Sequence, residues 1–211
     1  MTETQQRLVT IADIMRIAPV IPVLVIDDIA HAESIAGALV AGGLRVLEVT
    51  LRTPCALDAI AVMRRVPGAV VGAGTVLNAD ALAASIDAGA QFIVSPGLTD
   101  ALGAAAIAAG APFLPGVANA SDIMRGLDLG LSHFKFFPAE TSGGRAALRA
   151  LAGPFGQVQF CPTGGITPET APEWLALDQV LCVGGSWLVP RGAPNLEAIE
   201  AAACQAAGYA G

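Results

Sequence analysis

Hydrophobic and polar positions alternate along the chain in a repeating order of helix-like and strand-like segments. Helix-length stretches, such as 31–42 and 78–89, have apolar residues at three- and four-residue spacing. A glycine just past a helix end supplies the left-handed backbone conformation that ends many helices. Six such glycines recur at intervals of 20 to 26 residues, each at the start of a strand-like run: Gly43, Gly68, Gly89, Gly110, Gly130 and Gly156. The pattern predicts a repeated unit of helix, glycine and strand.

Eight strand-like runs consist almost entirely of apolar residues, as expected for parallel strands buried on both faces. They lie at 20–26, 45–51, 69–75, 91–97, 112–118, 133–138, 158–165 and 179–188. Eight strands that alternate with helices predict a (β/α)8 TIM barrel, an α/β fold. We expect a single domain over 1–211, with a short helix at 4–17 covering the N-terminal end of the barrel. An open, doubly wound sheet is the alternative, but the even spacing favours the barrel.

The composition of the chain limits the kinds of molecule that the protein is expected to bind. The chain has 211 residues, of which 54% are hydrophobic and 14% charged, and its net charge is −7. Nucleic acids and anionic membranes bind basic patches, so this charge argues against both as partners. The first ten residues lack the basic-then-apolar pattern of a secretion signal. We therefore expect a cytoplasmic protein with reduced cysteines.

Residues 101–121 contain no charged side chain and are long enough to cross a bilayer. They are only weakly hydrophobic, and Gly110, Pro112, Pro115 and Gly116 would interrupt a continuous helix. We expect a helix of a soluble protein here, followed by a buried strand.

The chain contains a single lysine, Lys135, and it lies in the aromatic segment HFKFFP. An unpaired charge is costly to remove from water, so an ammonium group is unusual in such a strand. Successive strand residues point to opposite faces. If Phe134 and Phe136 face the helices, His133, Lys135 and Phe137 point into the barrel.

The same alternation in the strand at 45–51 separates two sets of residues. Leu47 and Val49 are expected to pack against helices, which leaves Glu48 inside the barrel and Arg52 at its mouth. Active sites of these barrels lie at the C-terminal ends of the strands. The sequence therefore predicts that a carboxylate and an amine project into one interior, from the second and sixth strands.

A buried Lys135–Glu48 pair could simply fill the barrel. Such pairs break even at best, and apolar side chains are often as stable in their place, so this interpretation is the weaker one. Perturbed charges cluster at functional sites. Burial disfavours the ammonium form and frees the lone pair that attacks a carbonyl, so we expect Lys135 to form a Schiff base.

Two double glycines lie toward the ends of the last two strand-like runs, each next to a hydroxyl residue. The segments are Thr163-Gly164-Gly165 and Gly184-Gly185-Ser186. Glycine allows backbone N–H groups to approach an anion closely, and the loops after strands seven and eight are the usual phosphate site of these barrels. One Gly-Gly could be a turn, but two in these loops indicate a phosphate site.

The remaining candidate residues give weaker indications of function. His133 is expected to be a satisfied strand residue, and His31 a surface residue in a first helical turn. Thr75 and Pro96 end the third and fourth predicted strands, where they could either line the mouth or form turns. The cysteines and histidines show no metal-binding spacing, so we expect no metal and no other cofactor.

Six motifs, in this order and at this spacing, resemble those of the 2-keto-3-deoxy-6-phosphogluconate (KDPG) aldolase family, which includes 4-hydroxy-2-oxoglutarate aldolases. They are VLEVTLRT, VGAGTVL, SPGLT, FKFFPAE, GPFGQVQFCPTGGI and LCVGGSWLVP. The resemblance extends from about residue 19 to 190, and the motifs are highly specific when taken together.

This resemblance implies a (β/α)8 barrel, usually a homotrimer, that splits KDPG into pyruvate and glyceraldehyde 3-phosphate without a metal. It implies that Lys135 is the Schiff-base lysine and that Glu48 transfers protons. It assigns the pyruvate carboxylate to Arg52 and Thr75. The other implied substrate-binding residues are Pro96 and Phe137 beside the keto acid, Thr163 on the pyruvate side, and Gly164, Gly165, Gly185 and Ser186 at the phosphate.

Two further functions stay open. A relative acting on the galactonate epimer or on 4-hydroxy-2-oxoglutarate would share Lys135, Glu48 and Arg52. A non-catalytic barrel that binds a phosphorylated metabolite is also compatible with the fold, because fold does not determine function. A pure binding protein would need neither Lys135 nor Glu48, which counts against it.

Overall fold

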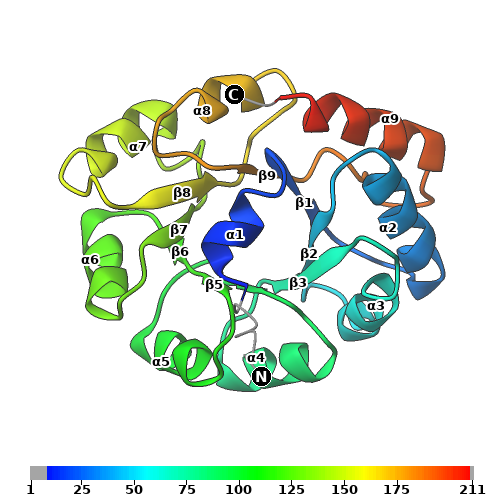
Figure 1. The fold of residues 1–211 in the computed structure, drawn as a ribbon, viewed down its shortest axis with the longest axis horizontal. Coiled ribbons are helices and arrows are strands. Elements are labelled where there is room, and N and C mark those ends of the chain that lie inside the picture. The colour runs from blue at the N-terminus through cyan, green and yellow to red at the C-terminus, as the bar shows by residue number, and fades with distance from the viewer. Residues whose placement is uncertain (1–8, 210–211) are drawn as a thin grey trace, which may run out of the picture.

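Parallel strands form the centre of the molecule, and helices surround them (Figure 1). The computed structural model describes residues 9–209. The strands are β1 (Val20–Leu24), β2 (Val46–Thr50), β3 (Val70–Gly74), β4 (Ile93–Val94), β5 (Phe113–Leu114), β6 (Gly116–Val117), β7 (His133–Phe136), β8 (Gln159–Pro162) and β9 (Val183–Gly185). The helices are α1 (Ile11–Met15), η1 (Ile29–His31), α2 (Ala32–Ala41), α3 (Ala56–Met63), α4 (Ala79–Asp87), α5 (Asp100–Ala108), α6 (Ala120–Asp128), α7 (Gly144–Ala152), α8 (Ala171–Leu175) and α9 (Leu196–Ala207).

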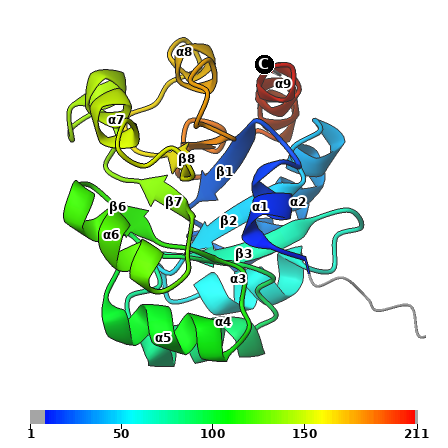
Figure 2. The same cartoon turned by 60° about the vertical axis from the view of Figure 1, so that its left-hand side comes forward.

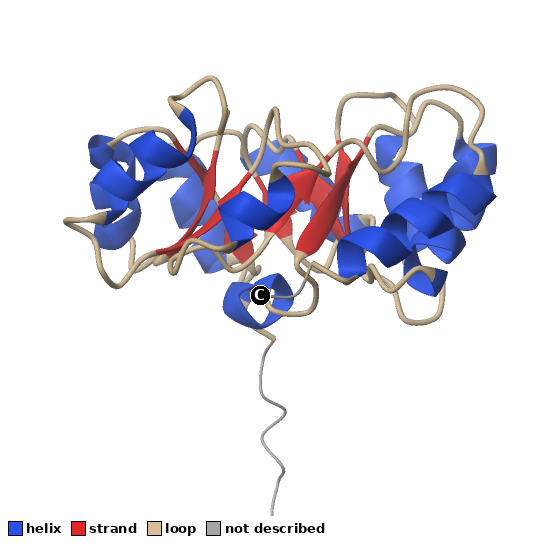
Figure 3. Cartoon of the chain, turned by 90° about the horizontal axis from the view of Figure 1, so that it is seen from above, coloured by secondary structure: helices blue, strands red, loops and turns tan. Residues whose placement is uncertain are grey.

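The strands pair in sequence order and close on themselves. One sheet has the order β5-β4-β3-β2-β1-β9, and the other has the order β6-β7-β8. Only Pro115 separates β5 from β6, and a parallel bridge between Thr163 and Gly184 joins the end of β8 to β9. The ring is therefore the predicted (β/α)8 barrel and not an open, doubly wound sheet. Figure 3 shows its strands between helices on either side.

The fifth predicted strand, at 112–118, is divided into β5 and β6. Pro115 has no N–H group to donate to a strand ladder. Its carbonyl oxygen still accepts a 2.8 Å hydrogen bond from the backbone N–H of Lys135. The ladder to β7 therefore continues past the interruption and holds Lys135 in register.

Two separate hydrophobic clusters confirm the predicted faces of β2 and β7. Leu47, Val49, Phe134 and Phe136 belong to the outer cluster, between the strands and the helices. The inner cluster includes Val46 and, from the other strands and α1, Ile14, Met15, Ile21, Phe92, Val94, Leu114, Cys161 and Cys182. Alternate strand residues thus point inward and outward as expected.

Helix α1 covers one end of the barrel (Figures 1 and 2). Its N-cap Thr10 forms a reciprocal capping box with Asp13, and Ile14 and Met15 are buried in the inner cluster. The predicted cover is confirmed, but the helix spans 11–15 instead of 4–17; positions 4–8 lie outside the described residues. The extended backbone of Thr10 fixes the start, and Pro19 disfavours helical geometry before it.

Residues 101–121 form most of α5, then β5 and β6, as predicted. Across residues 9–209 we find no helix with the length and apolar character needed to span a membrane. Five of the six repeat glycines have positive φ angles, from 62° at Gly110 to 94° at Gly43 and Gly89. Gly156 is the exception, because α7 ends earlier, at Ala152.

Candidate active site

Lys135 and Glu48 meet inside the barrel. The Nζ atom of Lys135 lies 2.9 Å from Oε1 and 3.3 Å from Oε2 of Glu48. Lys135 is 6% exposed and Glu48 is 3% exposed, so the ion pair is shielded from bulk water. The two residues come from β7 and β2, which stand opposite each other in the ring. The structure therefore confirms the prediction that the amine and the carboxylate lie close together inside the barrel.

Gly74, at the end of β3, provides the space that the Glu48 carboxylate occupies. A Cβ atom at this position would lie 2.2 Å from Oε1 and 2.8 Å from Cδ of Glu48. Glu48 pairs in register with Gly72 two residues earlier on β3. Sequence reasoning missed this role of Gly74, although the alternation of β3 places it beside the inward face of β2.

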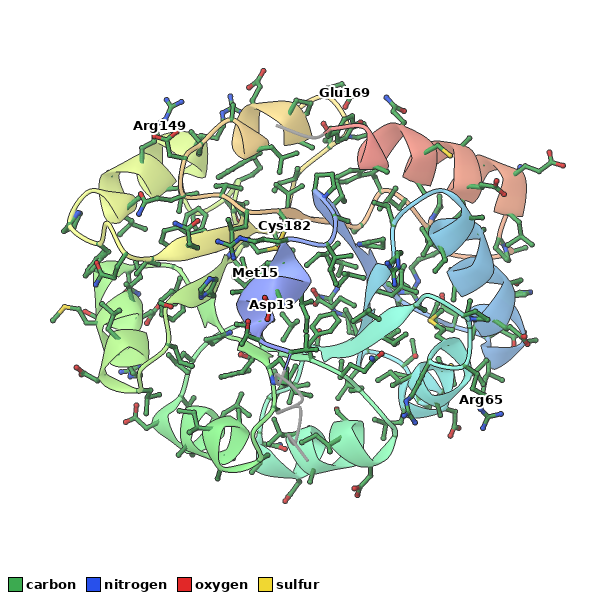
Figure 4. The ribbon with its side chains drawn as sticks, viewed as in Figure 1. Asp13, Met15, Arg65, Arg149, Glu169 and Cys182 are labelled. Atoms are coloured by element: carbon green, nitrogen blue, oxygen red, sulfur yellow. The ribbon has the colours of Figure 1, made fainter. Side chains whose placement is uncertain are left out.

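Two thiols lie in the inner cluster near the ion pair. Cys161 is the register partner of Lys135, and Cys182 comes from the segment that leads into β9. A hydrogen bond with Cys161, burial, and the nearby charges of Cys161 and Glu48 raise the pKa of Cys182 well above its usual value. Figure 4 shows Met15 and Cys182 at the centre of the ring. The Cys182 thiol near the ion pair is therefore neutral.

The side chains of Arg52 and Thr75 meet at the mouth. Arg52 Nε donates a 3.3 Å hydrogen bond to Thr75 Oγ1, and the Arg52 side chain is otherwise exposed. Thr75 has a φ angle of 60°, which is a strained conformation for a β-branched residue. The predicted pair is therefore adjacent, with the guanidinium held at the end of β2.

Two further predicted residues lie near the lysine and its strand. The Phe137 ring centroid is 5.5 Å from Lys135 Nζ, a distance at which an ammonium is attracted to a ring face. Pro96 is half-buried after β4, and its carbonyl oxygen would be 2.1 Å from a Cβ atom at Gly116 of β6.

The two double-glycine loops lie side by side. The bridge between Thr163 and Gly184 joins them, and a Cβ atom at Gly184 would lie 2.3 Å from Thr163 Oγ1. Gly164 and Gly165 have φ angles of 102° and 79°, which only glycine adopts readily.

In the second loop, the Trp187 ring packs against Gly185, where a Cβ atom would be 2.5 Å from the ring. Ser186, between these two residues, is exposed. The predicted phosphate loops are therefore adjacent, and their glycines are required by close packing and by backbone geometry.

His133 lies away from this constellation. It is half-buried at the start of β7, and its Nδ1 atom is 3.1 Å from the hydroxyl of Ser132. Burial and the nearby charge of Arg16 lower its pKa below the ordinary value of 6.5. His31 is the last residue of η1 and is half-buried, which corrects the prediction that it is a surface residue.

Within residues 9–209 there is no group of three His, Cys, Asp or Glu side chains that could hold a metal ion. The four cysteines are free thiols, of which Cys161 and Cys182 are buried and Cys204 is exposed.

A family model described as KDPG and KHG aldolase matches residues 11–202. The chain belongs to this family. It is 63% identical over 199 residues to a 2-dehydro-3-deoxy-phosphogluconate aldolase of Zymomonas mobilis, with 94% of this chain and 96% of the relative covered. The family assignment made from the six motifs is therefore confirmed.

Solved structures of KDPG aldolases agree closely with this barrel. The enzyme of Zymomonas mobilis with 3-phosphoglycerate is 62% identical, with a TM-score of 0.94 and coverage of 95% of this chain and 96% of that one. The enzyme of Legionella pneumophila, with pyruvate captured as a covalent carbinolamine, is 43% identical, with a TM-score of 0.92 and coverage of 95% and 99%.

Proposed function

We propose that this chain is a class I aldolase that cleaves KDPG into pyruvate and glyceraldehyde 3-phosphate through a Schiff base on Lys135. The observation that supports this most directly is the buried contact of 2.9 Å between Lys135 Nζ and Glu48 Oε1. A buried ion pair is seldom more stable than an apolar substitute, so its presence calls for a chemical reason. Membership of the family supplies that reason.

The first steps form the imine. Glu48 accepts a proton from Lys135, and the neutral amine attacks the C2 ketone of the substrate. The carbinolamine then loses water as Glu48 returns a proton to the departing hydroxyl group. The Legionella pneumophila enzyme, in which pyruvate was captured as a covalent carbinolamine, supports this order of steps.

Cleavage follows from the protonated imine. Glu48 takes the proton of the C4 hydroxyl, the C3–C4 bond breaks, and its electron pair moves into the imine. Glyceraldehyde 3-phosphate leaves, and the enamine of pyruvate remains on Lys135. Protonation at C3 and hydrolysis by one water molecule release pyruvate and restore the amine. The iminium is the electron sink, so the proposed reaction requires no metal and no other cofactor.

The two ends of the substrate are bound by different loops. Arg52 suits the carboxylate because its planar fork binds two oxygens at once, and Thr75 holds that fork in place. Pro96 and Phe137 flank the keto acid. Thr163 adjoins the pyruvate end, and the phosphate is bound by Gly164, Gly165, Gly185 and Ser186.

Irreversible trapping tests this proposal. Borohydride reduces a Schiff base to a stable amine, so pyruvate plus borohydride should inactivate the protein and add the reduced pyruvate to Lys135. Lys135→Arg should abolish both effects, because a guanidinium does not form the imine. Mass spectrometry of peptides locates the adduct. An adduct confined to the N-terminal amine would refute the assignment.

The same core could cleave unphosphorylated 4-hydroxy-2-oxoglutarate, because Lys135, Glu48 and Arg52 do not depend on the phosphate. The family includes KHG aldolases, which act on this substrate. The double-glycine loops favour the phosphorylated substrate. Comparing kcat/KM for the two substrates in a coupled pyruvate assay decides between them.

We further propose that the protein acts in the cytoplasm as a homotrimer, without nucleic-acid or membrane partners. Large apolar side chains at the surface support self-association: Leu77 is 60% exposed and Met124 is 56% exposed. The net charge of −7 argues against polyanionic partners. Free cysteines are typical of reducing compartments, and cell fractionation would test the location.

A further inference from the structure

Glu140 lies behind the first double-glycine loop and contacts it directly. It follows β7, and its Oε1 atom accepts a 2.9 Å hydrogen bond from the indole Nε1 of Trp174 on α8. Trp174 is fully buried, and its ring packs against Phe136 with the centroids 6.3 Å apart. The carboxylate is therefore directed toward the helical layer, although Glu140 as a whole is exposed.

The backbone at Glu140 also pairs with the loop. Beyond the strands, the Ala139 N–H donates to the Thr163 carbonyl at 2.8 Å, and the Glu140 N–H donates to the Gly164 carbonyl at 3.1 Å. The turn after β7 thus extends the β7–β8 ladder into the loop. These bonds hold the carbonyl groups of Thr163 and Gly164, which are the residues that precede Gly164 and Gly165 in the loop.

The side chain of Glu140 fills the space next to Gly165. A Cβ atom at Gly165 would lie 2.8 Å from both Cβ and Cγ of Glu140. Gly164 and Gly165 have positive φ angles, and a glycine pair is otherwise the most mobile type of backbone segment. The stem of Glu140, fixed at its far end by Trp174, restricts that mobility from the side of the helices.

We propose that Glu140 is a positioning residue that holds the Thr163–Gly165 loop in its phosphate-binding conformation, and so sets the preference for phosphorylated substrates. This inference rests on the proposed phosphate site. A carboxylate close to the bound phosphate would repel the phosphate. The hydrogen bond from Trp174 holds the Glu140 carboxylate toward α8. Glu140 touches neither the lysine nor the reacting carbons in the proposed mechanism, so its effect is on binding.

The test compares Glu140→Ala with Glu140→Gln on two substrates. Glu140→Ala should raise KM for KDPG by about tenfold and leave kcat nearly unchanged. This is the loss expected if the displaced loop gives up one hydrogen bond to the charged phosphate. KM for 4-hydroxy-2-oxoglutarate should stay within about twofold, since that substrate has no phosphate. Glu140→Gln keeps the stem and the acceptor oxygen, so it should restore most of the affinity.

Glu173→Gln is the matched control. Glu173 precedes Trp174 on α8 and forms an ion pair with Arg145 of α7, so the variant removes a carboxylate from the same surface without touching the loop. Its kinetic constants should equal those of the wild type. If it raised KM for KDPG as Glu140→Ala does, a general electrostatic or helix-docking effect would replace the positioning role.

The affinity for inorganic phosphate, measured by calorimetry, separates this inference from the proposed function. Ser186→Ala should weaken phosphate binding through the second loop, and Glu140→Ala should weaken it through the first, whether or not the protein cleaves KDPG. A wild type that binds phosphate but lacks aldolase activity would refute only the proposed function. A lowered KM in Glu140→Ala, equal losses on both substrates, or a Glu140→Gln variant as impaired as Glu140→Ala would each overturn the inference.

Discussion

The variant Gly74→Ala should test whether catalysis depends on the position of the Glu48 carboxylate, because it displaces the carboxylate without removing it. The added Cβ atom would lie 2.2 Å from Oε1 and 2.6 Å from Cγ of Glu48, closer than non-bonded atoms approach. Gly74 lies outside the positive-φ region, so the backbone accepts alanine without strain. The carboxylate must therefore shift from its observed position beside Lys135, while its charge remains in the barrel.

The size of the effect follows from this displacement. The carboxylate must move by roughly 1 Å, and a misplacement of that size in an active site costs about 100-fold in rate. The hydrogen bond of 2.9 Å to Lys135 Nζ is lost with it. Crowding in a packed interior destabilises by about 1–3 kcal/mol, which most folded proteins survive. We expect a folded protein whose kcat for KDPG is about 100-fold lower.

A coupled assay of pyruvate release, normalised to the folded fraction, measures this effect. Glu48→Gln sets the scale, because removing a positioned acid–base group costs roughly 10²–10⁴-fold. The double variant Gly74→Ala/Glu48→Gln should be little slower than Glu48→Gln alone, since both changes remove one function. Borohydride trapping at Lys135 should be slower in each variant, because dehydration of the carbinolamine also needs the proton transfers.

Gly37→Ala is the matched control for glycine replacement. Gly37 lies in α2, and a Cβ atom there would meet no atom within 4 Å. Alanine in a helix should stabilise the protein by about 0.5–1 kcal/mol and leave kcat unchanged. Normal turnover in folded Gly74→Ala, or losses that multiply in the double variant, would refute the idea that Glu48 works from its observed position.

Two further predictions concern stability and assembly. The pKa of His133 is lowered by burial and by Arg16, so below its ordinary value of 6.5 the unfolded chain binds a proton that the folded chain does not, and acid destabilises the fold. His133→Asn should therefore lose less Tm than the wild type between about pH 7.5 and 5.5, and an equal loss would contradict this. Light scattering should give a mass three times the chain mass of 21.2 kDa, whereas a monomer mass would exclude the trimer.

The faces of the strands could be predicted from the sequence because burial imposes a strict alternation. If β2 or β7 shifted its register by one residue, every side chain would move to the other face of the sheet. The apolar residues of the outer face would then lose their contacts with the helices, so the register is strongly specified. The inward direction of Glu48 and Lys135 followed directly from that alternation. The contact between them depended only on the ring closing, which the even repeat had indicated.

The contacts that could not be predicted join residues through space without a pattern in the sequence. Nothing near Gly74 in the chain indicates that its missing side chain makes room for Glu48. The bond from Trp174 to Glu140 joins residues 34 positions apart, from a short helix and a turn that have no periodicity. The interruption at Pro115 was visible in the sequence, but its consequence depends on whether the neighbouring strand needs the missing donor.

The arrangement of the barrel interior fits the catalytic role that we propose for the ion pair. Met15 and the other inner-cluster residues make one end apolar and closed by α1. In the proposed mechanism, this closed interior shields the contact of 2.9 Å between Lys135 and Glu48 from bulk water, so that the proton passes directly between the two side chains. In the proposed binding mode, Arg52 follows β2 and Ser186 follows β9, with only β1 between these two strands. A substrate held at both ends would therefore lie over this part of the mouth, with its keto carbon directed at Lys135 on β7, the strand opposite β2.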